Sequence, residues 1–129
     1  MNEPITISDE FSRVKFLCNR TPETTDDEAK DSFALLSKYR NGGIYIANYS
    51  GNSEWEKHPN GDEFVHVLEG ETCLILLENK QEKVNQLVAG QIMVIPKDSW
   101  HRFESPKGVK IMTITPQPTE HRVERPVDV

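Results

Sequence analysis

The sequence predicts an all-β domain, either closed into a barrel or folded as two packed sheets. Short apolar stretches recur along the chain, and turn-forming residues separate them. The length of 129 residues, with 36% hydrophobic and 28% charged residues, suits one globular domain with a single core. We expect residues 1–50 to supply N-terminal strands and a hairpin, residues 51–115 the core of the barrel, and residues 116–129 an extended tail.

The first thirty residues are mostly polar. Ile5–Ile7 and Val14–Leu17 are predicted to be short edge strands, since Pro4 and polar residues stand close to them. Residues 21–31 form either a loop or a short helix, and Thr25 with Glu28 three positions later would be the capping box of such a helix.

A hairpin is predicted next. Asn41-Gly42 lies between two apolar-rich runs, Phe33–Tyr39 and Ile44–Tyr49, and this dipeptide is a strong hairpin signal. The alternative is that Ser32–Arg40, which contains good helix formers, extends the preceding helix.

The central stretch begins with two strands joined by a turn at Pro59-Asn60-Gly61. Glu56 and His58 are two residues apart on the first strand, so they share a face. Glu63 follows the turn, and Val65 and Val67 alternate behind it on the face that should be interior. A hairpin between these strands would place Glu63 beside His58.

The remaining strands follow in order. Gly70 is expected to end the second strand, and Thr72–Glu78 is a nearly continuous apolar strand. Asn79-Lys80 would turn the chain back into Glu82–Val88. A second motif then runs from the strand Ile92–Ile95 through Pro96 and a turn to a strand with His101 and Phe103 on one face, and Val109–Thr115 is the last strand.

Two imidazoles and two carboxylates are thus predicted to meet inside the domain. Ionisable groups are costly to bury unless something pairs with them, and a divalent cation would satisfy all of them together. The other reading is a metal-free barrel in which these side chains satisfy each other by hydrogen bonds. We expect metal ligation by His58, Glu63 and His101, with Glu56 as a fourth ligand or as an acceptor that orients an imidazole.

These two stretches resemble the paired motifs of the cupin superfamily. The first is matched by His58, four residues, Glu63, six residues and Gly70; the second by Gly90, five residues, Pro96 and His101. The resemblance covers about residues 51–105 and implies a small single-domain cupin, a double-stranded β-helix or jelly-roll-like barrel. For function it implies little, because cupins host many unrelated activities.

The chain departs from the family pattern at three positions. Glu56 stands where a His is usual, Asp98 where a Gly is usual and Ser105 where an Asn is usual. Asp98 is tolerable, because Asp enters turn conformations more readily than most residues. Glu56 either converts a site of three His and one Glu into one of two His and two carboxylates, or it withdraws a ligand.

The donor set suggests one divalent metal ion, Fe, Mn, Ni or Zn, and the absence of thiolates disfavours softer metals. We expect a barrel that binds this ion, with a small polar ligand or O₂ completing its coordination; if the protein is an enzyme, dioxygenase-like oxidation is the first reaction class and isomerase- or lyase-like chemistry the second. The alternative is a non-catalytic cupin that binds or senses a small molecule, with or without metal. A third reading is a metal-free barrel that serves only as a dimer scaffold.

The remaining histidines and the aromatic residues are not expected to bind the metal. His66 should point outward and His121 should be solvated in the tail, while Trp55 and Trp100 should face away from the metal as packing or subunit-contact residues. Three more rings, Phe103, Tyr45 and Tyr49, are considered as pocket residues, Phe103 equally as core.

Charge and composition limit the partners. The net charge is −6, the sequence pI is about 5.2, and no Lys/Arg cluster occurs, so neither nucleic acid nor a membrane is expected as a partner. No signal peptide is visible, and the two cysteines have no metal-type spacing, which suggests small buried thiols in a reducing cytoplasm. We expect a cytoplasmic homodimer with a small-molecule ligand, because a second copy often covers the exposed edges of such barrels.

Overall fold

The computed structural model describes residues 2–127. Two short helices and nine strands make up these residues. In chain order they are α1 (Ile7–Phe11), β1 (Leu17–Arg20), α2 (Asp26–Ala29), β2 (Phe33–Tyr39), β3 (Gly42–Asn52), β4 (Trp55–Lys57), β5 (Glu63–Glu78), β6 (Gln81–Val88), β7 (Ile92–Ile95), β8 (His101–Pro116) and β9 (Glu120–Arg122).

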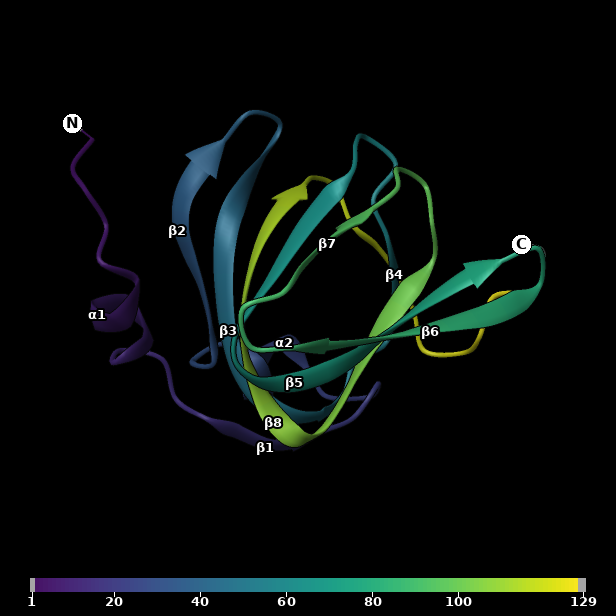
Figure 1. The fold of residues 1–129 in the computed structure, drawn as a ribbon, viewed down its shortest axis with the longest axis horizontal. Coiled ribbons are helices and arrows are strands. Elements are labelled where there is room, and N and C mark those ends of the chain that lie inside the picture. Colours follow the sequence, from purple (N-terminus) through teal and green to yellow (C-terminus); the bar gives the residue numbers. More distant parts are fainter. Residues whose placement is uncertain (1, 128–129) are drawn as a thin grey trace.

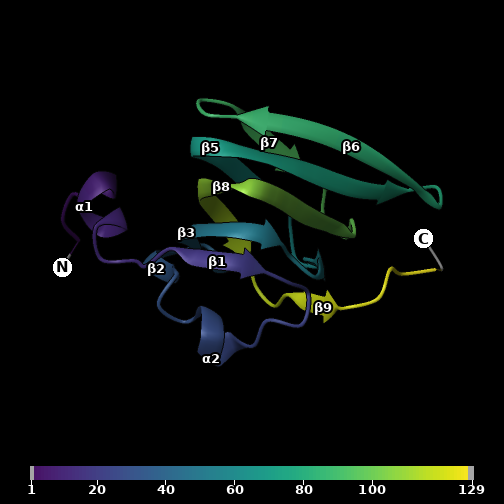
Figure 2. The same ribbon diagram turned by 90° about the horizontal axis from the view of Figure 1, so that it is seen from below.

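The strands form a barrel, which confirms the predicted all-β domain. One run of neighbours is β1-β3-β8-β4-β9, with β2 added to β3, while β5 pairs with β6, β7 and β8. Figure 1 looks into the space that these strands enclose, and Figure 2 shows β6, β5, β8, β3 and β1 following one another across the molecule. The two 16-residue strands, β5 and β8, pair along most of their length and hold the barrel together.

Gly70 bends β5 rather than ending it, so the predicted break there was wrong. The pairing of β5 with β8 shifts register between Gly70 and Cys73, and Gly70 has a φ of +76°. A Cβ atom on Gly70 would lie 2.3 Å from the carbonyl oxygen of Gly108. The lack of a side chain therefore lets the two long strands cross closely where the barrel wall turns.

The N-terminal region differs from the prediction in part. The expected strand Ile5–Ile7 is absent, since α1 begins at Ile7, and β1 begins only at Leu17, the last residue of the expected strand Val14–Leu17. The capping box is confirmed: Thr25 accepts from the Glu28 amide while the Glu28 carboxylate accepts from the Thr25 amide.

The hairpin around Asn41-Gly42 is confirmed as β2 and β3, which pair antiparallel. The two strands on either side of Pro59-Asn60-Gly61 were expected to pair with each other, and this prediction was wrong. Strand β4 pairs with β8 and β9 and not with β5. The tail also contributes a strand, β9, which lies against β4. The first motif is thus a turn between two different parts of the wall, and it still brings its residues together.

Two apolar clusters fill the domain. The larger lies inside the barrel, where side chains alternate inward along β5 and β8; its buried members are Ala47, Tyr49, Val65, Val67, Leu74, Leu76, Leu87, Ile95, Phe103, Val109 and Ile111. The smaller contains Trp55, Ile75, Leu77 and Trp100. As predicted, the two tryptophans pack away from the histidine face of their strands.

Within residues 2–127, neither helix has the length and apolar character needed to cross a bilayer. The expectation of two buried thiols was wrong for Cys18, which is exposed, while Cys73 is half-buried.

Candidate metal centre

Three segments bring the predicted ligands to one place. His101 opens β8, with Leu76 of β5 opposite it on one side and Glu56 of β4 on the other. Glu63 opens β5 opposite Ile95. His58 follows β4, and its carbonyl oxygen accepts a hydrogen bond of 3.0 Å from the Asp98 amide. The turn after β7 is thereby tied to the turn after β4.

The Asp98 turn explains one departure from the family pattern. Asp98 has a φ of +65°, the left-handed conformation that favours glycine and that Asp tolerates. Its neighbour Lys97 donates its amide to the Asp62 carboxylate at 2.7 Å, a second bond between the two motif turns.

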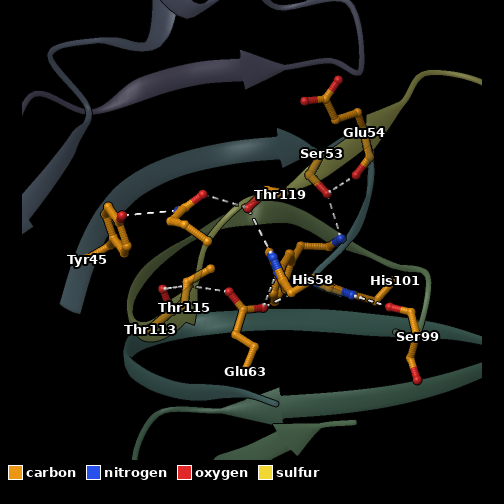
Figure 3. Close-up of polar contacts among 12 residues, drawn as sticks. Tyr45, Ser53, Glu54, His58, Glu63, Ser99, His101, Thr113, Thr115 and Thr119 are labelled. Carbon is orange, nitrogen blue, oxygen red and sulfur yellow. Dashed lines mark hydrogen bonds and ion pairs between the residues drawn. The ribbon is translucent and has the colours of Figure 1, made fainter. Parts of the chain in front are cut away.

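His58, Glu63 and His101 lie at the centre of this region with their ligand atoms facing one another (Figure 3). The Oε1 atom of Glu63 is 3.4 Å from Nε2 of His58 and 3.2 Å from Nε2 of His101. The two imidazole rings are 5.1 Å apart between centroids and inclined by 47°. All three side chains are buried, and His101 is fully so.

Within the part of the chain that the structure describes, none of these three facing atoms has a hydrogen-bond partner. Nε2 of His58, Oε1 of Glu63 and Nε2 of His101 are buried and unsatisfied. Buried polar atoms nearly always have a partner, and three such atoms converging on one point fit a divalent cation. Imidazole nitrogen and carboxylate oxygen are donors suited to that ion.

The far nitrogen of each imidazole is held by a partner. Nδ1 of His101 lies 2.9 Å from the Ser99 carbonyl oxygen, which can only accept, so this nitrogen carries the proton. Nδ1 of His58 lies 3.0 Å from the Thr119 hydroxyl. Both rings therefore turn Nε2 toward the centre, and a hydrogen-bonded far nitrogen is the usual arrangement of metal-binding histidines.

The Thr119 contact continues outward through the tail of the chain. The Thr119 hydroxyl lies 3.4 Å from the Gln117 side-chain oxygen, and the Gln117 amide donates to the Tyr45 hydroxyl at 3.1 Å. Figure 3 shows this line of contacts from Tyr45 to His58. The segment between β8 and β9 thus orients an imidazole, a role that no motif in the tail indicated.

The carboxylate is oriented by hydroxyls. Thr115 donates to Oε2 of Glu63, and the Thr113 hydroxyl lies 2.8 Å from that of Thr115. With Oε2 bound in this way, Oε1 is the atom turned toward the histidines.

Glu63 and His101 shift each other's pKa, each toward the charged form. Burial opposes the ionised form of Glu63, but contacts with His101 and His58 outweigh it and lower the pKa of Glu63 to about 2. Burial likewise opposes a proton on His101, but Glu63, with smaller contributions from Glu56 and Ser99, outweighs it and raises the pKa of His101. Glu63 is therefore a carboxylate at neutral pH.

Glu56 also lies close to the two histidines. One carboxylate oxygen of Glu56 and one ring nitrogen each of His58 and His101 lie within 4.8 Å of one another. The Glu56 side chain is half-buried, whereas the histidines are enclosed. Glu56 thus has a carboxylate oxygen near both histidines, at the position where the motif it resembles usually has a His.

A cavity of about 160 Å³ adjoins the cluster, with Glu56 and Glu63 in its wall. Most of the remaining wall is aromatic or aliphatic, and a few threonines and Gln117 add polar groups. Phe103, Tyr45 and Tyr49 are all part of it, so the three rings considered from the sequence do line a pocket.

The other predicted histidine positions are confirmed. His66 is half-exposed and contacts Phe64 on the opposite face of β5 from Glu63, and the exposed His121 pairs with Glu54 at 2.6 Å. Sequence reasoning missed Thr115, Thr119 and Arg20, which also lines the cavity. Their distance from the motifs in the chain left no signal for them.

Two comparisons show what the chain is similar to. The uncharacterized protein YdbB of Bacillus subtilis (strain 168) is 32% identical over 81 residues, 61% of this chain and 69% of that protein. A cupin-2 domain containing protein from Shewanella frigidimarina superimposes with a TM-score of 0.62 at 24% identity, over 92% of this chain and 94% of that one.

A second similar structure is hydroquinone 1,2-dioxygenase PnpCD in complex with Cd²⁺ and 4-hydroxybenzonitrile. It has a TM-score of 0.56 at 20% identity, over 65% of this chain and 63% of that one. At sequence identities of 24% and 20%, these two structures are evidence for the fold alone.

The family model described as "Cupin domain" matches residues 45–115, which is more than half of the chain and contains both histidine motifs. The match, the barrel and the motif spacing agree: the chain belongs to the cupin family.

Proposed function

We propose that this protein binds one divalent metal ion through Glu56, His58, Glu63 and His101 and uses it to hold and convert a small organic molecule in the adjoining cavity. The observation that carries the proposal is the set of three buried, unsatisfied atoms facing one another, two imidazole nitrogens and one carboxylate oxygen. Glu56 is proposed as the fourth ligand because it approaches both histidines from the cavity side.

The residues around the ligands prepare them for this role. The Ser99 carbonyl keeps the proton of His101 on Nδ1, and Thr119 engages Nδ1 of His58, so both Nε2 lone pairs stay available. Thr115 holds the second oxygen of Glu63. Such fixed contacts reduce the reorganisation needed when a metal is bound.

The metal, when bound, would supply a Lewis acid or, as Fe(II), a centre for O₂ chemistry. Two histidines with carboxylates that leave positions open resemble the donor set of non-haem iron oxygenases, so dioxygenase-like oxidation is the first reaction class to test. Isomerase or lyase chemistry is the second. The apolar rings of the cavity would surround the substrate and limit water near the ligands.

Metal content tests the proposal directly. Protein purified without chelator and without a nickel column should contain about one divalent ion per chain, and a His58→Ala/His101→Ala variant should contain almost none. His66→Ala is the matched control, because His66 lies on the opposite face of β5 and should leave the metal content unchanged. Equal metal content in wild type and the double variant would overturn the proposal.

Oxygen consumption separates an enzyme from a binder. The Fe(II)-loaded protein is followed with an oxygen electrode in the presence of small organic acids, thiols and phenols, with His58→Ala/His101→Ala as the blank. Uptake in the wild type alone supports oxidation. Binding of a compound without uptake favours the non-catalytic binding or sensing alternative.

We also propose an oligomeric state and a cellular compartment for the protein. The protein is proposed to work as a homodimer in the cytoplasm on a small-molecule ligand. Light scattering of the purified protein checks the dimer, and fractionation of the cell of origin checks the compartment.

A further inference from the structure

Arg20 is a cation without a partner carboxylate in the wall of the metal-adjacent cavity. It ends β1, lines the cavity together with Glu56 and Glu63, and is only half-buried. Across residues 2–127, no Asp or Glu lies within ion-pair distance of its guanidinium group. Arginine side chains in clefts usually pair with an anion, so this one is available to a ligand.

The guanidinium group is held in place by aromatic rings. It lies 5.0 Å from the ring centroid of Phe33 and 4.7 Å from that of Tyr49, and these two rings stack on each other. Such contacts, together with the Tyr49 hydroxyl beside the group, fix its plane, and the guanidinium has further N–H donors for a ligand. Burial raises the pKa of the Tyr49 hydroxyl, which therefore stays neutral and does not cancel the charge of Arg20.

The backbone is shaped to bring Arg20 to this position. Asn19 has a φ of +58°, and its amide donates to the Ser50 hydroxyl at 2.9 Å, where the pairing of β1 with β3 shifts register. Arg20 then lies opposite Gly51, on which a Cβ atom would be only 2.2 Å from the Arg20 carbonyl oxygen. A side chain at position 51 would push Arg20 away from the barrel.

The charges in the cavity wall indicate what kind of ligand fits. The charged residues of the lining are Arg20, Glu56 and Glu63. Without metal the two carboxylates repel an anion, whereas a bound divalent cation neutralises them and leaves the single positive charge of Arg20. The other walls are largely apolar, so a ligand with one negative charge on an apolar body matches the cavity.

We infer that Arg20 binds the carboxylate of a small organic acid whose aromatic or other apolar body lies along the rings of the cavity. This inference rests on the proposed function, since the acid binds only when metal has neutralised Glu56 and Glu63. Guanidinium and carboxylate are matched in shape and form two parallel hydrogen bonds. Phosphate dianions fit less well, because the wall offers one cation and no further basic side chain.

Benzoate and benzamide, which share shape but not charge, test the inference by titration calorimetry on Zn²⁺-loaded protein. Benzoate is expected to bind at least tenfold more tightly than benzamide. Arg20→Gln should weaken benzoate binding by about tenfold to a hundredfold and leave benzamide binding unchanged. Arg20→Lys should restore part of the loss, because lysine keeps the charge but not the planar pair of donors.

Arg122→Gln is the matched control, since Arg122 also lies over an aromatic ring, that of Trp100, but outside the cavity wall. It should bind benzoate as the wild type does. Equal benzoate affinity in wild type and Arg20→Gln, equal affinity of the wild type for benzoate and benzamide, or no benzoate binding to Zn²⁺-loaded wild type overturns the inference.

The metal measurement separates the two proposals. Zn²⁺ content is determined on the same samples before each titration. If the wild type fails to take up Zn²⁺, the proposed function fails and this inference falls with it. If Zn²⁺ binds to both wild type and Arg20→Gln and the charge preference is absent, the inference alone is overturned. Benzoate binding to metal-free protein with equal strength also overturns it.

Discussion

Replacing Glu63 by Gln in metal-free protein should change how stability depends on pH. Glu63 is 4% exposed and lies 3.2 Å from His101 and 3.4 Å from His58 through one oxygen. Gln keeps the size of the side chain and its contact with Thr115 but cannot ionise. The variant thus removes the charge interaction while largely preserving the packing of the barrel.

The size of the effect follows from the pKa of Glu63, which falls from 4.5 to about 2 in the folded chain. A carboxylate with a lowered pKa stabilises the fold fully above its unfolded value, and this contribution is lost as the pH falls from 4.5 toward 2. Since one pKa unit corresponds to about 1.4 kcal/mol, the shift amounts to about 3 kcal/mol.

The contribution of His101 to the stability depends on pH in the opposite direction. The pKa of His101 is raised above 6.5, chiefly by Glu63 acting against burial, so its contribution is present below 6.5 and is lost as the pH rises through the raised value. The stability difference between wild type and Glu63→Gln should therefore be largest between about pH 4.5 and 6.5 and shrink on both sides.

Urea unfolding in the presence of a chelator measures this difference, with tryptophan fluorescence as the signal because Trp55 and Trp100 are buried. Glu69→Gln is the control: Glu69 pairs with Lys110 at 2.9 Å on the surface and should give a small difference that hardly varies with pH. A constant difference between wild type and Glu63→Gln from acid to alkaline pH would refute the reasoning.

Three further predictions concern single contacts. Thr119→Val removes the partner of one histidine Nδ1 and should weaken metal affinity by about tenfold to a hundredfold in competition with a chromophoric chelator; unchanged affinity would contradict the role of Thr119. Gly70→Ala and Gly90→Ala both strain a positive φ, but only the Cβ on Gly70 meets a backbone atom, so Gly70→Ala should cost about 2 kcal/mol more in urea unfolding, and equal costs would count against the close crossing. Trp100→Ala empties a site that is 4% exposed and should cost about 3 to 5 kcal/mol in the same assay; a loss below about 1 kcal/mol would show that the outer cluster contributes little.

Predictions from the sequence were most accurate where the residue types in one short segment and their alternation along a strand indicated the same structure. Val65 and Val67 identified the inner face of β5, and this face correctly placed Glu63 inside the barrel. The turn residues around Asn41-Gly42 correctly predicted the hairpin of β2 and β3. In both cases the signal lies within one short segment, where backbone geometry decides the outcome.

Partner choice between strands was less predictable. The two sides of the turn at Pro59-Asn60-Gly61 were expected to pair with each other, yet β4 lies against β8 and β9. The turn residues specify a reversal, but which strands then pair depends on the twist and closure of the whole barrel. Gly70 similarly permits either an end or a bend, and the crossing with Gly108 decides for the bend.

The groups that support the centre could not be found from the sequence. Thr119 contacts His58 across 61 positions of the chain, and Thr115 contacts Glu63 across 52. Arg20 reaches the cavity only because a bulged strand crosses Gly51. Threonine and arginine are common residues with many surface roles, so only three-dimensional placement distinguishes these from the others.

The central claim is that Nε2 of His58, Oε1 of Glu63 and Nε2 of His101 bind one cation inside the barrel. Anomalous diffraction from crystals of the manganese- or zinc-loaded protein, recorded on both sides of the metal absorption edge, tests it most directly. The account predicts a single strong peak within bonding distance of all three atoms. A peak elsewhere, or none at this position in metal-loaded crystals, would contradict it.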